Sequence, residues 1–374
     1  MFPTLRQFTG PFDLRRFPWV LLGAALLLVL IGTLFITSAK SFAYAQRQLI
    51  FLAVGLLGFF AVALFDYRHL AALAAPAFGV GVLMLGLLPV LGVEINNARR
   101  WYDLGAFHMQ PSELVKYMVV VALATYFAYC KRVDRLRDLI LPLGITLIPI
   151  VLIVLQPDLG TAMLFLPVFF GVAFLAGVPF RNLALVAAAG CVLLVGAWLT
   201  PGVLHDYQKR RLTAFINPGA NPHSAAAYNA RQATLAVAGG GWTGQGWGEG
   251  VLNRMRRIPE RHTDFIFPVI AEEWGFVRST AFIAFYLLLL GLIARIAWDT
   301  HGQFGRLLVG GILTLLAVQG LLHLAISLRL APITGLTLPF ISYGGSSLVV
   351  SMAGLGLVAG VRIRSEFVPS QRSY

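Results

Sequence analysis

Apolar runs separated by short polar segments dominate this chain of 374 residues. Most runs are about 16 to 24 residues long, close to the roughly 20 residues that a helix needs to cross the hydrocarbon core of a bilayer. The pattern therefore predicts an all-α polytopic membrane protein with ten transmembrane helices. These helices are expected at Phe17–Ile36, Leu49–Phe65, Leu70–Val93, Leu114–Tyr129, Leu139–Leu155, Gly160–Leu175, Leu183–Leu199, Val277–Ala297, Leu307–Leu330 and Ser347–Val361.

The composition excludes a soluble fold, because 58% of the residues are hydrophobic and only 12% are charged, whereas soluble domains carry about 25% charged residues. The mean hydropathy is +0.78. We treat residues 1–374 as a single integral membrane domain. Its longest polar interval, Pro201 to Thr263, predicts a large extracytoplasmic loop between the seventh and eighth helices.

The distribution of Lys and Arg predicts the orientation of the chain. Because these residues are enriched in cytoplasmic loops, both termini are expected in the cytoplasm. The formal charge of +13 does not indicate a nucleic-acid partner, since the basic residues form no patch on a soluble module. The basic residues on the side of the termini are Arg6, Arg15, Arg16, Arg68, Lys131, Arg132, Arg135, Arg137, Arg181, Arg295, Arg306, Arg362, Arg364 and Arg372, whereas the opposite short loops hold Lys40, Arg47, Arg99, Arg100 and Arg329.

Four polar segments fall on the predicted external side, next to the ends of the helices. They run from Asn96 to Lys116, from Gln156 to Gly160, from Pro259 to Phe265, and from Pro339 to Ser347. Most of the acidic side chains also gather on this side. We therefore expect an active site that opens outward, formed where these segments converge.

Two of the segments carry charges whose role stays open at this point. Glu113 and Lys116 are three residues apart on one helix face, so they form either a helix-start ion pair with Lys116 snorkelling toward water or a functional intramembrane site. Asp158 either caps the sixth helix or presents a carboxylate at the mouth of the bundle. Arg100, next to Trp101, is either an interfacial anchor or a phosphate clamp.

Asp264 lies directly before the apolar stretch 265–270, where water gives way to lipid. It is either the N-cap of the next helix or a general base. His262 is two residues away, but no HExxH motif accompanies the pair, so a metal site formed by the protein alone is not expected. The glycine-rich stretch from Gly239 to Gly250 has no preceding strand and is no dinucleotide site. Its bare backbone suggests a loop close to a ligand or to the membrane interface.

The four segments and the glycine-rich loop, in this order, resemble the SEDS family of polytopic membrane proteins, which includes the RodA and FtsW branches. The resemblance runs from Ala98 to Ser347. It rests on Arg100-Trp101, Gln110-Pro111-Ser112-Glu113 with Lys116, Gln156-Pro157-Asp158-Leu159-Gly160-Thr161, Pro259-Glu260-x-His262-Thr263-Asp264-Phe265-Ile266-Phe267 with Ala271-Glu272-Glu273, and Pro339 to Ser347.

The resemblance implies a multi-pass protein of the bacterial cytoplasmic membrane with ten spans and cytoplasmic termini. It also implies a peptidoglycan glycosyltransferase that polymerises lipid II, releases undecaprenyl diphosphate, and serves cell-wall elongation and cell shape. The implied partners are a class B penicillin-binding protein, which acts as transpeptidase, and membrane lipids. No definite cofactor is expected for this reaction. A divalent cation that binds the leaving diphosphate is the one candidate.

The essential loop aspartate of the family corresponds to Asp264, which is the expected catalytic residue. Glu113, Lys116, Arg100 and Asp158 correspond to further functional positions of the family. The remaining candidates lie within the matched motifs. The residues expected to bind substrate are Glu113, Lys116, Arg100, Asp158, His262, Thr263 and Ser342.

One stretch departs from the family pattern. Where many members carry Asn-x-Gly-Met before the last external loop, this chain has His323-Leu324-Ala325-Ile326, so the role of the ninth helix is open. The stretch Trp101-Tyr102-Asp103-Leu104-Gly105 and the short basic tail look more like the RodA branch than the FtsW branch.

Two other functions fit part of the sequence. A lipid II flippase also needs many spans and intramembrane charges, but it would need polar residues along the whole translocation depth. A structural scaffold leaves Lys116 and the external carboxylates unexplained. Glycan formed from purified lipid II would separate a glycosyltransferase from both alternatives.

Overall fold

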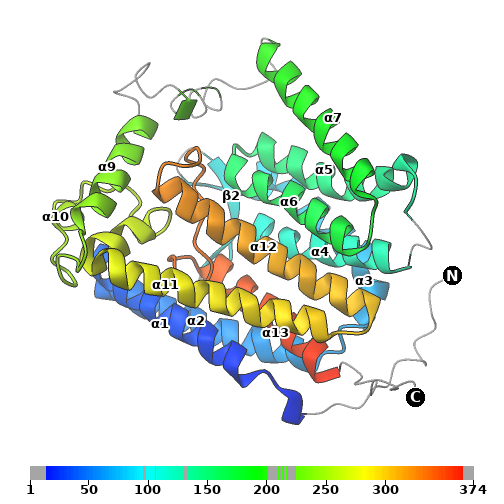
Figure 1. The fold of residues 1–374 in the computed structure, drawn as a ribbon, viewed down its shortest axis with the longest axis horizontal. Helices are drawn as coiled ribbons and strands as arrows, with labels where there is room; N and C mark the ends of the chain where they lie inside the picture. The colour runs from blue at the N-terminus through cyan, green and yellow to red at the C-terminus, as the bar shows by residue number, and fades with distance from the viewer. Residues whose placement is uncertain are drawn as a thin grey trace.

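The computed structural model describes residues 14–95, 98–105, 107–129, 133–200, 209, 213, 215–216 and 225–364. Long helices pack side by side in one bundle (Figure 1). They are α1 (Trp19–Ala39), α2 (Phe42–Leu64), α3 (His69–Leu91), α4 (Pro111–Tyr129), α5 (Ile140–Leu155), α6 (Leu159–Leu175), α7 (Phe180–Leu199), α11 (Ile266–Asp299), α12 (Gln303–Ser327) and α13 (Gly345–Arg364). The shorter elements are η2 (Leu14–Arg16), β1 (Val93–Ile95), β2 (Ala98–Asp103), β3 (His108–Met109), η3 (Leu136–Leu139), α9 (Ala225–Gly239) and α10 (Val251–Arg254).

Eight of the described helices are long and apolar enough to cross a membrane. Two further apolar stretches, in α6 and α7, fall below that length among the described residues. The predicted class, a multi-pass helical membrane protein, is therefore confirmed. The count of exactly ten spans stays a prediction, because length and composition support eight.

The centre of the bundle is formed by α4, α12 and α13, whose side chains are buried on nearly all sides. Helix α2 packs along α13, α3 packs against α4, and α12 contacts α4, α6 and α11. Helix α7 behaves differently, since it diverges from the bundle in Figure 1 and its apolar side chains from Val192 to Val195 are exposed. Apolar side chains that point outward are expected where lipid is the solvent.

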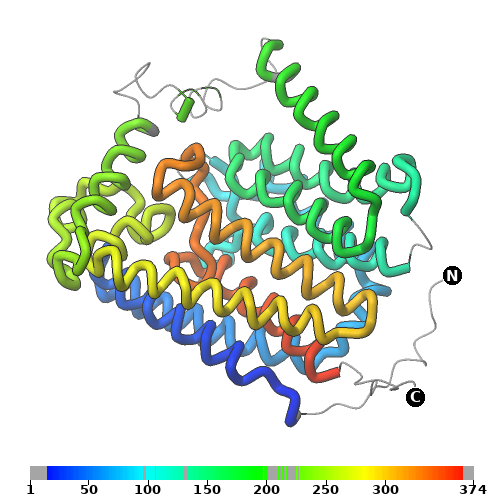
Figure 2. The backbone as a smooth tube through the Cα atoms, viewed as in Figure 1, coloured from blue at the N-terminus to red at the C-terminus, as the bar shows by residue number. Residues whose placement is uncertain are grey.

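The two ends of the bundle differ in composition. The start of α1 and the end of α13 lie at one end, whereas α9 and α10 lie at the other (Figure 2). The first of these ends is basic: Arg68 donates to the carbonyl of Arg364, and Arg362 forms an ion pair of 3.1 Å with Asp299. We call the opposite end the polar end, because all four polar segments singled out above meet there.

Three features differ from the sequence prediction. A small antiparallel sheet in the order β1-β2-β3 lies between α3 and α4, so the fold is not purely helical. Helix α2 starts at Phe42 rather than at Leu49, since the polar first turns still continue the helix. Helix α11 starts at Ile266 rather than at Val277. A further helical segment precedes the predicted span, and a break that hydropathy does not reveal separates the two.

The break in α11 occurs at Gly275, whose φ of 72° favours glycine. The amide groups freed by the break find partners in the glycine-rich loop: Phe276 donates to the carbonyl of Gly241 over 2.8 Å. A Cβ atom at Gly244 or at Gly275 would overlap backbone atoms of the facing segment. The bare backbone at Gly240 and Gly244 therefore allows close contact with α11.

The interval Pro201 to Thr263 is only partly described. Residues 201–208, 210–212, 214 and 217–224 lie outside the described residues. The rest contains α9 and α10, and α10 is held by Glu272 of α11, which accepts hydrogen bonds from the amides of Leu252 and Asn253. Glu273 accepts hydrogen bonds from Asn253 and Ser38. This part of the predicted loop is thus packed on the bundle.

Candidate functional site

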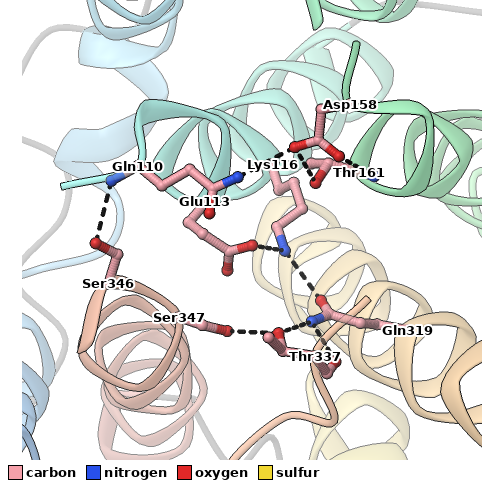
Figure 3. Close-up of polar contacts among 9 residues, drawn as sticks. All are labelled: Gln110, Glu113, Lys116, Asp158, Thr161, Gln319, Thr337, Ser346 and Ser347. Atoms are coloured by element: carbon pink, nitrogen blue, oxygen red, sulfur yellow. Dashed lines mark hydrogen bonds and ion pairs between the residues drawn. The ribbon is translucent and has the colours of Figure 1, made fainter. Parts of the chain in front are cut away.

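A chain of polar side chains begins at the first turns of α4 and ends at α13 (Figure 3). The Lys116 ammonium donates to Glu113 Oε1 over 2.9 Å and to Gln319 Oε1 over 3.0 Å. Gln319 in turn donates to the carbonyl and the hydroxyl of Thr337, and Thr337 Oγ1 lies 3.2 Å from Ser347 Oγ. Residues from α4, α12, α13 and the preceding loop are therefore joined in one network.

The Glu113–Lys116 ion pair is buried. The side chains of Lys116 and Glu113 are 2% and 8% exposed, so Lys116 does not snorkel toward water. Removing one partner of such a pair costs about 3–5 kcal/mol, because the other charge is left uncompensated. The i,i+3 pairing predicted from the sequence is therefore present, and it is buried inside the polar end of the bundle.

Asp158 is the N-cap of α6. Its carboxylate accepts hydrogen bonds from the amide and the hydroxyl of Thr161, at 3.2 and 2.9 Å, and from Gln110 Nε2 at 3.1 Å. The capping interpretation is thus correct. The bond to Gln110 also ties α6 to the segment that enters α4, so Asp158 lies beside the Glu113–Lys116 pair (Figure 3).

Arg100, on β2, braces the turn between α5 and α6. Its Nε donates to the carbonyl of Gln156 over 2.9 Å, and its Nη2 donates to the carbonyl of Pro157. Gln156 Nε2 in turn donates to the carbonyl of Leu85 on α3. The geometry supports a positioning role for Arg100 next to Asp158, and phosphate binding by Arg100 stays a prediction.

Asp264 lies in the loop that precedes α11 and is half-buried. It does not cap α11, because Phe265 holds the N-cap position. The backbone of Gly335 passes beside the carboxylate: a Cβ atom at this glycine would be only 3.2 Å from Asp264 Oδ2. Gly335, with a φ of 76°, is part of the loop 328–344 between α12 and α13, which we call the α12–α13 loop.

His262, Thr263 and Ser342 fasten the Asp264 segment to the same loop. Ser342 Oγ donates to the carbonyl of Thr263 over 2.6 Å and accepts a bond from the amide of Leu338 over 2.8 Å. The amide of Tyr343 donates to the carbonyl of His262 over 2.9 Å. The geometry therefore supports a role in positioning Asp264 for these three residues, and substrate contacts by them stay a prediction.

The imidazole of His262 is enclosed by aromatic rings. Its centroid lies 5.4 Å from that of Tyr44 and 5.7 Å from that of Tyr343. Burial, together with the nearby charges of Lys40 and Arg261, lowers the pKa of His262 to about 4. The ring is therefore neutral at physiological pH.

The structure thus gathers the predicted residues into two clusters that share one support. Glu113, Lys116 and Asp158 form one cluster, and Thr337 of the α12–α13 loop reaches it through Gln319. Asp264 lies in the other cluster, beside Gly335 of the same loop.

Sequence reasoning missed Gln319 as a functional candidate. Its signal was present, because Gln319 is a polar residue within an otherwise apolar predicted span, and such residues are usually functional or paired. Thr337 could not be found in the same way, since its place in the network depends on how the α12–α13 loop folds.

The carboxylates of the first cluster are engaged by protein donors. Glu113 is paired with Lys116, and Asp158 accepts three hydrogen bonds. In the described part of the chain, no three His, Cys, Asp or Glu residues are grouped as metal ligands. A divalent cation at the substrate stays a prediction, and no step is assigned to it.

The low pKa of His262 predicts sensitivity to acid. In the unfolded chain its pKa is near 6.5, so between pH 6.5 and pH 4 the unfolded state binds more protons than the folded state. The stability that the neutral ring contributes is complete above pH 6.5 and is lost as the pH falls toward 4. From pH 7 to pH 5 the loss should be about 2 kcal/mol.

His262→Phe, which keeps an aromatic ring, should remove this part of the acid sensitivity when free energies of unfolding are compared at pH 7 and pH 5. His301→Phe is the control, because His301 is exposed. An equal loss of stability in the parent and in His262→Phe would refute the assignment.

Comparison with known proteins identifies the family of this chain. Residues 15–366 match the family model of FtsW, RodA and SpoVE, described as cell cycle proteins. The "Probable peptidoglycan glycosyltransferase FtsW" of Nitrosococcus halophilus is 33% identical over 93% of this chain and 92% of its own length. Peptidoglycan glycosyltransferase MrdB of Escherichia coli K12 is 31% identical over 87% of both chains.

Solved structures agree with this assignment. A chain from a study of polymerisation and crosslinking by a peptidoglycan synthase complex has a TM-score of 0.82 and 36% identity, covering 94% of this chain and 99% of that one. The rod shape determining protein RodA of Thermus thermophilus has a TM-score of 0.70 and 32% identity, covering 97% and 100%. The RodA-like features of the sequence are compatible with these neighbours. The chain belongs to the FtsW/RodA/SpoVE family, the SEDS family that its motifs resemble.

Proposed function

We propose that the protein is a peptidoglycan glycosyltransferase that polymerises lipid II at the outer face of the cytoplasmic membrane. The observation that carries the proposal is the polar end itself, where the half-buried Asp264 lies beside Gly335 of the α12–α13 loop and the buried Lys116 is linked to Thr337 of the same loop through Gln319. Relatives named as peptidoglycan glycosyltransferases support the reaction class. The RodA-like features of the sequence and the RodA structural neighbour support a role in elongation and cell shape.

In the proposed reaction, the sugar 4-hydroxyl of an acceptor lipid II attacks the anomeric carbon of a lipid-linked donor. The new glycosidic bond forms as the bond between that carbon and the diphosphate oxygen breaks, with inversion, and undecaprenyl diphosphate leaves with the electron pair. Asp264 takes the proton of the attacking hydroxyl. Gly335 has no side chain, so its backbone can pass close beside this carboxylate.

Lys116 is the cation suited to the leaving diphosphate. An ammonium has three N–H donors, and Glu113 and Gln319 accept two of them. A preorganised positive charge in a low-dielectric site stabilises developing negative charge more than it would in water. Glu113 holds Lys116 in place until substrate arrives, which accounts for an ion pair buried at this depth.

The depth of the polar groups favours a transferase over a flippase. Glu113 and Lys116 lie in the first turns of α4. Beyond them, from residue 118 to the end of α4, the only charged or strongly polar side chains are hydroxyl groups. A polar path through the bundle would need such groups along the whole helix.

The orientation and the partner complete the proposal. The basic end of the bundle faces the cytoplasm with both termini, and the polar end with the loop 201–263 faces outward, as the bias of Lys and Arg indicates. A class B penicillin-binding protein crosslinks the product; a structural neighbour from a synthase complex that couples polymerisation with crosslinking supports this partner. If the cognate transpeptidase neither co-purified with the chain nor changed its rate, this part would be wrong.

Asp264→Asn tests the reaction most directly. The amide cannot accept a proton as the carboxylate does, so polymerisation of purified lipid II should fall by about 10² to 10⁴ in rate. Asp103→Asn is the matched control, because Asp103 is exposed on the same end of the bundle and its carboxylate accepts a hydrogen bond from the amide of Gly105 in the neighbouring turn. The two variants should elute alike in size-exclusion chromatography. Glycan synthesis by Asp264→Asn at the rate of Asp103→Asn would remove Asp264 from the mechanism.

A double substitution separates the catalytic and structural roles of the ion pair. Lys116→Met alone leaves the Glu113 carboxylate buried without its partner and should lower the free energy of unfolding by about 3–5 kcal/mol. Glu113→Gln combined with Lys116→Met removes both charges and should recover most of that stability, while polymerisation stays lost at every lipid II concentration. Recovery of both stability and activity would show that the pair only holds the fold.

A further inference from the structure

His323 is the residue at which this chain departs from the family pattern, and the structure gives it a specific contact. The side chain is 0% exposed, one turn before the end of α12. Its Nδ1 atom lies 2.7 Å from the carbonyl oxygen of Leu336. A carbonyl oxygen only accepts hydrogen bonds, so Nδ1 carries the proton and donates it. Nε2 is buried and has no hydrogen-bond partner among the described residues.

Leu336 occupies a critical place in the α12–α13 loop. It directly follows Gly335, whose backbone passes beside the carboxylate of Asp264. It directly precedes Thr337, which accepts the bonds from Gln319 and so leads to Lys116. The bond from His323 therefore fixes the loop at the point between its contacts with the two clusters.

Other contacts show which segments a displacement of the loop would disturb. A Cβ atom at Gly160 of α6 would be 2.5 Å from the carbonyl oxygen of Thr334, so the loop lies directly against the start of that helix. On its other side, Ser342 connects it to Thr263, the residue before Asp264. A shift of Leu336 would thus move the surroundings of the proposed base.

We propose that His323 is a positioning residue for catalysis. Its rigid imidazole donates a hydrogen bond that holds the α12–α13 loop, and through this loop it sets the position of Gly335 against Asp264. His323 itself touches no substrate. Its role therefore concerns the turnover rate rather than substrate affinity, and the catalytic part of the inference rests on the proposed glycosyltransferase activity.

Two substitutions of nearly equal size test the role of the donor. His323→Asn keeps an amide donor bonded to Cγ, as Nδ1 is, whereas His323→Leu has the same shape but no donor. We expect His323→Asn to keep kcat within about threefold of the parent. His323→Leu should lose at least about tenfold in kcat with KM for lipid II almost unchanged, because small displacements at a reacting centre cost rate.

Tyr286→Phe is the control for the loss of any buried hydrogen bond near α12. The Tyr286 hydroxyl donates to the carbonyl of Leu316 over 2.8 Å, joining α11 to α12 away from the loop. This variant should keep the parent kcat. Equal kcat values for His323→Asn and His323→Leu, or an equal loss in Tyr286→Phe, would overturn the proposal.

Hydrogen–deuterium exchange of the loop gives a readout that does not depend on the reaction. Amides in residues 331–344 should exchange faster in His323→Leu than in the parent and in His323→Asn. If the parent made no glycan, the proposed function would fail, yet this comparison would still test the contact. Unchanged exchange in His323→Leu would refute the positioning role, whatever the activity.

Discussion

Buried backbone that is not helical needs hydrogen-bond partners, and the α12–α13 loop obtains them from side chains of other elements. Gln48 of α2 donates to the carbonyl of Ser342 over 3.1 Å. Gln319 and His323 of α12 contact the carbonyls of Thr337 and Leu336. These three polar residues inside the apolar bundle, Gln48, Gln319 and His323, are therefore explained first by the loop that they hold.

This requirement also determines how the two clusters are related. A fully satisfied buried polar network favours one arrangement, because each alternative leaves a group without its partner. Lys116 and Asp264 come from segments far apart in the chain. Lys116 contacts Gln319, which donates to the α12–α13 loop, and Asp264 lies beside Gly335 of the same loop. A carboxylate and a cation can thus be kept in fixed positions at the edge of a membrane, where lipid provides no polar contacts.

Hydropathy predicted most of the helices, because a spanning helix needs a minimum apolar length and little else. The i,i+3 spacing likewise predicted the Glu113–Lys116 pair, which is a local feature. The break in α11 was missed, since Gly275 acquires its meaning only from contact with the distant Gly244. The carbonyls bound by Arg100 could not be predicted either, because a sequence does not show which backbone groups a long side chain will meet.

The central claim is that the α12–α13 loop couples the two clusters, and a double-mutant cycle measures this coupling. Gln319→Met removes the bonds to Thr337, and Ser342→Ala removes the bond to Thr263. Free energies of unfolding for both single variants and the double variant can be obtained by steric trapping in bicelles. If one loop supports both clusters, the double variant should be at least about 1 kcal/mol more stable than the sum of the single effects predicts. Additivity within about 0.5 kcal/mol would show that the clusters are independent.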